Sequence, residues 1–109
     1  MSKAKALDPL VRISSMILDL RLSRLEQAAR KRAESQTRLA SLIVEPVESD
    51  LPLAVVEQAR LRYEQWAEVR RAEINLTLAR QTAEWLLARD AARVAFGRAE
   101  ALKKLRGGA

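Results

Sequence analysis

The chain of 109 residues is long enough for one small domain. It has no cysteine and no histidine, which excludes disulfides, thiol chemistry, the commonest metal ligand and the usual acid–base group near neutral pH. Three glycines and three prolines are too few for the turns of an all-β protein, and a net charge of +6 from 20 basic and 14 acidic residues suits either an anionic partner or a solvated helix surface.

The first predicted helix spans about residues 8–44. Asp8 can cap free amide groups, and Pro9 suits a first helical turn because its missing N–H has no partner there. No glycine or proline follows before Val44. A stripe with alternating steps of four and three residues predicts a coiled-coil seam, the strip of side chains that faces a second helix. The predicted seam residues are Val11, Ser15, Leu18, Leu22, Leu25, Ala29, Arg32, Gln36, Leu39 and Ile43.

A break is predicted at residues 45–52, because Pro46 and Pro52 cannot both lie inside one helix. The second predicted helix spans about residues 52–105, with Ser49 or Asp50 as its cap. Its predicted seam residues are Ile74, Leu78, Gln81, Trp85, Ala88, Ala92, Ala95, Ala99 and Leu102. An earlier stripe, made of Val56, Ala59, Tyr63 and Trp66, is out of phase with this seam and predicts a stutter near Arg70.

The sequence therefore predicts an all-α fold, a single antiparallel coiled-coil hairpin whose second helix is the longer. Folding the chain about the middle of the break predicts that facing residues have numbers that add to about 96, with Leu22 opposite Ile74 and Pro9 opposite about Leu87. In that register the second helix extends past the first by about 18 residues, or about 27 Å, at the end where the two chain termini lie.

This overhang and a second apolar stripe near the start of the first helix predict a partner-binding surface at the terminal end. The candidate contact residues are Ile13, Met16, Ile17, Leu20, Ala92, Ala95, Phe96, Ala99 and Leu102. Tyr63 and Trp66 form a second candidate contact. The alternatives are that the N-terminal arm covers the apolar surface or that the chain self-associates.

The carboxylates lie on charged helix faces beside basic residues, and a two-helix hairpin offers no cavity for a substrate. We therefore expect a non-enzymatic protein without a metal or cofactor. No apolar run approaches the length of a membrane span, and the first seven residues lack the apolar core of a signal peptide, so a cytoplasmic location is expected.

The predicted hairpin resembles the FliJ-like stalk proteins of the flagellar and injectisome type III export ATPases. Three segments carry the resemblance: Leu7-Asp8-Pro9-Leu10-Val11-Arg12-Ile13, Tyr63-Glu64-Gln65-Trp66, and Arg98-Ala99-Glu100-Ala101-Leu102. The resemblance implies an antiparallel coiled coil similar to the rotor stalk of rotary ATPases. It also implies that the terminal end enters the ATPase hexamer and that another part contacts the export gate protein.

Two other functions fit the same sequence. A basic hairpin can bind the backbone of a nucleic acid, although the aromatic residues stand at seam-like spacing rather than as stacking platforms. A cytoplasmic export chaperone could instead hold an amphipathic helix of its partner against the apolar end. Nucleic-acid binding would weaken steeply with salt, whereas apolar docking would not.

Overall fold

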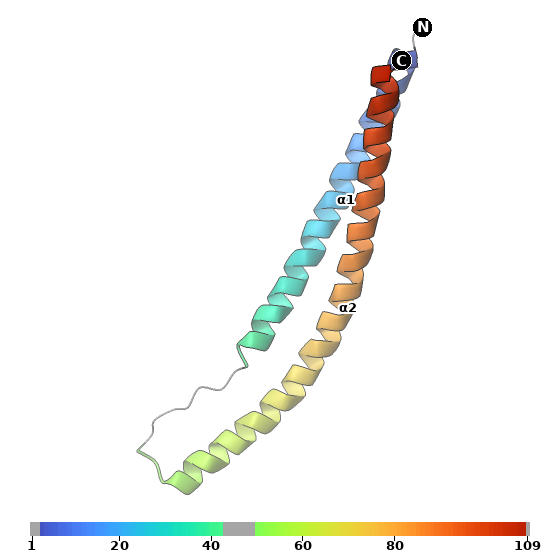
Figure 1. Ribbon diagram of the computed structural model, residues 1–109. Helices are drawn as coiled ribbons and strands as arrows, with labels where there is room; N and C mark the ends of the chain where they lie inside the picture. The colour runs from blue at the N-terminus through green and yellow to red at the C-terminus, as the bar shows by residue number, and fades with distance from the viewer. Residues whose placement is uncertain (1–2, 43–49, 109) are drawn as a thin grey trace.

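The computed structural model describes residues 3–42 and 50–108, which form two helices joined as a hairpin (Figure 1). Helix α1 spans Lys3–Ala40 and helix α2 spans Leu53–Gly108, with 38 and 56 residues. The helices run antiparallel in a rod of 87 × 21 × 15 Å. The predicted all-α hairpin with a longer second helix is confirmed.

The start of α1 differs from the prediction. The helix begins at Lys3 rather than at Asp8, and Pro9 lies inside it. Proline fixes a backbone angle that a helix can use and removes only one N–H donor, here in the second turn. Asp8 is not a cap, because it lies five residues inside the helix, where its carboxylate contacts Arg106 of α2 at 3.5 Å.

Local hydrogen bonds mark the inner ends of both helices. Ser41 donates its N–H to the carbonyl of Thr37 at 3.0 Å as α1 finishes, and the carbonyl of Pro52 accepts from Val55 and Val56 at 3.0 and 3.1 Å as α2 begins. Pro52 is therefore the cap position of α2. The predicted ends near Val44 and Leu105 are wrong, because α1 already ends at Ala40 and α2 continues to Gly108. Residues 43–49, most of the predicted break, lie outside the described part of the chain.

The seam of α2 agrees with the sequence. Side chains that are not fully exposed recur in alternating steps of four and three from Ala67 to Arg106. All nine predicted seam positions belong to this set. The seam residues of α2 are Ala67, Arg71, Ile74, Leu78, Gln81, Trp85, Ala88, Ala92, Ala95, Ala99, Leu102 and Arg106.

The observed seam of α1 differs from the predicted seam by one residue at every second position. Val11, Leu18, Leu25, Arg32 and Leu39 are confirmed as partly or fully buried. The intervening positions are wrong, because the helix buries the residue three rather than four after each of these. Leu22, Ala29 and Gln36 thus lie exposed beside the seam. Ser15 is partly buried, although its neighbour Ser14, 8% exposed, occupies the seam position, and Ile43 lies outside the described residues. The seam residues of α1 are Ala4, Leu7, Val11, Ser14, Leu18, Arg21, Leu25, Ala28, Arg32, Ser35, Leu39 and Leu42.

Polar side chains fix the register between the helices. Ser35 donates to Gln81 Oε1, and Arg32 Nε donates to Thr82 Oγ1 at 3.1 Å. The Arg32 guanidinium also lies over the ring of Trp85, 5.2 Å from its centroid, and Arg89 lies 5.6 Å from the same ring. Polar pairs inside a coiled coil select one register over its neighbours, because a slipped register leaves them unpaired.

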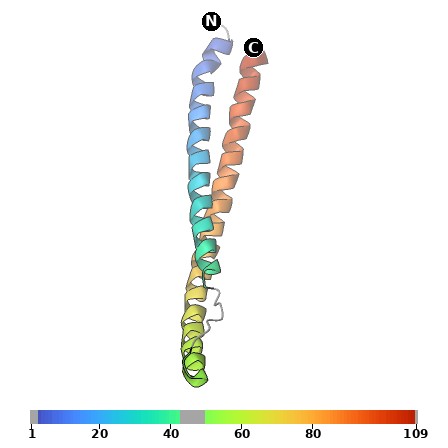
Figure 2. The same cartoon turned by 90° about the vertical axis from the view of Figure 1, so that its left-hand side faces the viewer.

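This register contradicts the one predicted. Contacting residues have numbers that add to between 114 and 117 rather than to about 96, as in the pairs Asp8–Arg106 and Arg32–Trp85. The two termini therefore lie level at one end of the rod (Figures 1 and 2). Helix α2 extends past α1 at the opposite end, by about 20 residues or about 30 Å.

We expect the polar contacts of Arg32 to stabilise the hairpin modestly. Replacing Arg32 with Ala removes a hydrogen bond and a cation–π contact and is expected to lower the free energy of unfolding by about 1 kcal/mol. Arg38→Ala is the matched control, since the Arg38 side chain makes no ion pair among the described residues. Urea titrations of both variants measure the difference, and equal midpoints would contradict a role for Arg32.

Candidate partner-binding surfaces

One stripe of large apolar side chains is exposed on each helix in the half of the rod that carries the termini. Each of these residues directly precedes a seam residue, as Ile17 precedes Leu18 and Val94 precedes Ala95. Their exposed fractions run from 44% at Ile17 to 71% at Leu87. We call this set the terminal face; it consists of Leu10, Ile13, Ile17, Leu20, Leu87, Val94 and Leu105.

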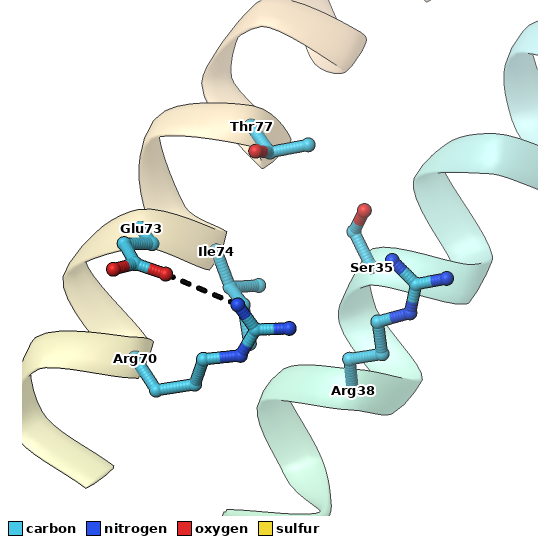
Figure 3. Close-up of a pocket in the computed structure, with 6 residues that line it drawn as sticks. All are labelled: Ser35, Arg38, Arg70, Glu73, Ile74 and Thr77. Atoms are coloured by element: carbon cyan, nitrogen blue, oxygen red, sulfur yellow. Dashed lines mark hydrogen bonds and ion pairs between the residues drawn. The ribbon is translucent and has the colours of Figure 1, made fainter. Parts of the chain in front are cut away.

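The two stripes lie on the same side of the hairpin. An antiparallel helix pair has an approximate two-fold axis perpendicular to the plane of the helices, so residues that precede the seam on either helix share one side. A shallow groove farther along the rod shows this directly, because Arg38 of α1 and Arg70 and Thr77 of α2, all of which precede seam residues, line it together (Figure 3). The terminal face is therefore one continuous surface built by both helices.

Four of the predicted contact residues do not belong to this surface. Ala92, Ala95 and Ala99 have exposed fractions of 4%, 6% and 0%, and Leu102 is partly buried, because α1 covers them. The prediction that they are free for a partner is wrong. It depended on an overhang at the terminal end, and the observed register places α1 there instead.

The other predicted contact residues at this end are exposed. Ile13, Ile17 and Leu20 belong to the terminal face, and Met16, 65% exposed, extends it away from the seam. Phe96 is also exposed, but it follows the seam residue Ala95 rather than preceding it, so it lies on the opposite side of the hairpin. The structure thus brings four of the nine residues together on one surface.

Cations border the terminal face. Arg24 continues the stripe of α1 by one further step, and Arg98 stands between Val94 and Leu105 on α2. Together with Lys104 they make no ion pair with any described residue. An apolar surface with unpaired positive charges beside it favours a partner that offers apolar side chains next to carboxylates or phosphates.

The second candidate contact lies at the other end of the rod. Tyr63 and Trp66 project from the part of α2 that α1 does not reach, and their rings lie 5.6 Å apart at 45°. Trp66 is 55% exposed, whereas its neighbour Ala67 is 1% exposed and belongs to the seam. The seam runs unbroken from Ala67 to Ile74, so the predicted stutter near Arg70 is wrong: the aromatic stripe simply lies one position beside the seam.

The groove in Figure 3 offers little chemistry. Arg70 Nη1 donates to Glu73 Oε2 at 3.0 Å, which pairs this carboxylate of the groove with a base. Ser35 and Thr77 supply hydroxyl groups, and the described lining residues include no second acid. Within residues 3–42 and 50–108, no three acidic side chains come together as a metal site would require.

Comparison of the chain with models of known protein families, with curated proteins and with solved structures finds no match. Neither described helix is long and apolar enough to cross a membrane. The candidate surfaces therefore rest on the geometry of the hairpin alone.

The predicted contact set omitted Leu10, Leu87, Val94 and Leu105, although Val94 and Leu105 were among the apolar residues of the predicted overhang. A usable signal was present for Leu10, Leu87 and Val94, because each directly precedes a predicted seam residue, as Ile17 does. The predicted register left this part of the second helix without a neighbouring helix. Without a neighbour the sequence could not indicate which of its side chains lie on the same side as the stripe of the first helix.

Proposed function

We propose that the chain is a non-enzymatic coiled-coil coupling protein that docks the terminal half of its hairpin against a protein partner. The terminal face carries this proposal. Each helix of a two-helix hairpin buries one apolar stripe against the other helix. The seven large apolar side chains of the terminal face lie outside that stripe and are exposed, and an exposed apolar patch of this kind marks a surface that binds a partner.

The resemblance to FliJ-like stalk proteins gives the partner in this proposal. The hairpin would insert its terminal half into a type III or flagellar export ATPase, as a rotor stalk does, and would contact the export gate protein elsewhere. The rod, 87 Å long with both helix ends that carry the termini at one end, supports an inserted stalk. A cytoplasmic location follows from such a role.

The unpaired cations favour a second candidate function. Arg24, Arg98 and Lys104 stand free of carboxylates among the described residues, as the phosphate contacts of a nucleic-acid-binding hairpin would. Raising the salt concentration separates the two functions. The affinity for nucleic acid falls as salt is added, and falls more steeply the more phosphates the protein contacts. The affinity of apolar docking changes little with salt.

The docking proposal predicts a strong effect of charge on the terminal face. Ile13→Asp combined with Ile17→Asp is expected to weaken binding to a purified export ATPase from the same organism at least about a hundredfold, because central apolar contacts dominate interfaces. The double variant should remain folded, since both residues lie outside the seam. Titration calorimetry and circular dichroism measure the two quantities.

Val69→Asp combined with Leu76→Asp is the matched control. Both residues are exposed aliphatics of α2, and neither belongs to the terminal face. The control should bind like the unmodified protein. Absence of binding by the unmodified protein would contradict the export-ATPase partner, and equal binding by both double variants would contradict the terminal face as its site.

A further inference from the structure

The part of α2 that extends past α1 carries an apolar stripe of its own. Residues 53–66, here the tip segment, place Val56, Ala59, Tyr63 and Trp66 in steps of three, four and three. Tyr63 and Trp66 are exposed, at 39% and 55%. Such spacing is that of a helix that packs on a second helix, yet α1 ends before reaching it.

The seam of the hairpin does not continue into the tip segment. At the positions where its steps of three and four would fall stand Glu57, Arg60 and Glu64. Arg60 holds both carboxylates, at 3.0 Å from Glu57 and 3.8 Å from Glu64. Among the described residues these charges pair along one helix, so the seam that α2 shares with α1 does not extend into the tip segment.

The stripe is complementary to itself when two copies run antiparallel. With the two-fold axis at Leu61, Val56 faces Trp66 of the second copy, and Ala59 faces Tyr63 of the second copy. Each contact sets a small side chain against a large one, which is how facing helices interdigitate at native packing density. A parallel pairing would instead set Trp66 against Trp66 and Ala59 against Ala59.

The charges also favour a second copy at this end. The tip segment has no net charge, because Glu57 and Glu64 balance Arg60 and Arg62, and Arg71 pairs with Glu68 at 2.8 Å just beyond it. Two such surfaces approach with little repulsion. The terminal face, with its free cations, would repel a copy of itself.

We propose that two copies of the chain associate through their tip segments, antiparallel, with Tyr63 and Trp66 as the central contacts. The dimer is a rod with a terminal face at each end. Its length is about 150 Å, from two hairpins of 87 Å that overlap over the tip segment. This proposal does not depend on the identity of the partner at the terminal face.

Sedimentation equilibrium and small-angle X-ray scattering test the dimer. At about 0.5 mM the full chain should sediment partly or wholly as a dimer, since that concentration detects even a millimolar Kd. The maximum dimension should rise to about 150 Å. Tyr63→Ala combined with Trp66→Ala should raise the Kd at least about tenfold, whereas Val69→Ala combined with Leu76→Ala should not.

Cysteine cross-linking tests the orientation, because the natural chain has no cysteine. Arg62 stands beside the stripe next to the two-fold axis, so Arg62→Cys should form a disulfide-linked dimer on oxidation. Val56→Cys should not, since an antiparallel pairing places the two copies of residue 56 about 15 Å apart along the axis. A parallel pairing would instead cross-link Val56→Cys and not Arg62→Cys, because it places the two copies of a residue beside the stripe on opposite sides of the interface.

Three results would overturn the proposal. The full chain could remain monomeric at the highest concentration. It could dimerise with a maximum dimension near that of one hairpin and lose the dimer in the Ile13→Asp, Ile17→Asp variant, which would place the interface on the terminal face. Val56→Cys could cross-link and Arg62→Cys not, which would exclude the antiparallel arrangement.

Discussion

Replacing Ala99 with Asp is expected to lower the free energy of unfolding by about 3 kcal/mol or more, the largest effect of any single change considered. Ala99 is 0% exposed and lies in the seam with Ala92 and Ala95, where α1 packs directly on the alanine side chains. An aspartate there buries a charge without a partner, and such changes are among the most destabilising known. Thermal melting followed by circular dichroism measures the loss.

Ala101→Asp is the control for this prediction. It makes the same change two residues away in the same helix, at an exposed position, so any effect of a carboxylate near the end of α2 is equal in both variants. Its unfolding free energy should stay within about 0.5 kcal/mol of the unmodified protein. Similar melting temperatures for the two variants would mean that α1 does not cover Ala99, as an overhang at the terminal end would require.

The two tryptophans are expected to differ sharply. Trp85→Ala should lower the free energy of unfolding by about 2–3 kcal/mol, because the Trp85 ring fills the seam between the guanidinium groups of Arg32 and Arg89. Trp66→Ala should change it by less than about 0.5 kcal/mol, since the Trp66 side chain is exposed within one chain. Denaturant titrations of both variants measure the contrast.

These titrations are best done at micromolar concentration, where association between copies adds little to the stability of the folded chain. A large loss for Trp66→Ala under these conditions would mean that the tip segment packs on another part of its own chain. If Trp85→Ala left the free energy of unfolding unchanged, the cluster of Arg32, Trp85 and Arg89 would not be what stabilises the observed register.

The sequence was sufficient to predict the two helices, the hairpin and the seam of α2. These features depend on local patterns: few glycines or prolines inside the helices, prolines at the break, and an unambiguous repeat from Ile74 to Leu102. The helix ends departed from their local signals: α1 begins at Lys3, where Asp8 contacts Arg106 of α2, and ends at Ala40, and α2 continues to Gly108.

The register could not be obtained from the same patterns. Counting from the break assumes that both helices end together beside it, and α1 ends at Ala40, well before the level at which α2 begins. The phase of α1 was also ambiguous, since Leu22 is more apolar than its neighbour Arg21. The structure nevertheless leaves Leu22 48% exposed and turns Arg21 toward the seam, where the aliphatic part of a long side chain can be buried while its charge reaches water.

Charged residues in α2 held information about the register. Glu57, Arg60 and Glu64 occupy the positions to which the α2 seam extrapolates, and a seam made of charged residues is a poor surface for α1. This pattern indicates that α1 does not extend alongside the tip segment. The wrong register changed the predicted binding site. A shift of about 18 residues makes the alanine stripe of α2 exposed in the predicted register, whereas it is buried against α1 in the structure.

The register is the central claim, since it places the terminal face on both helices and leaves the tip segment without α1. Disulfide formation between paired cysteines tests it most directly in a chain that has none. Ser35→Cys with Gln81→Cys should form an intramolecular disulfide rapidly on oxidation, because the two native side chains are hydrogen-bonded. Ser35→Cys with Leu61→Cys, which would face each other if facing numbers added to about 96, should not. Rapid closure of the second pair and not the first would contradict the register, and with it both proposed surfaces.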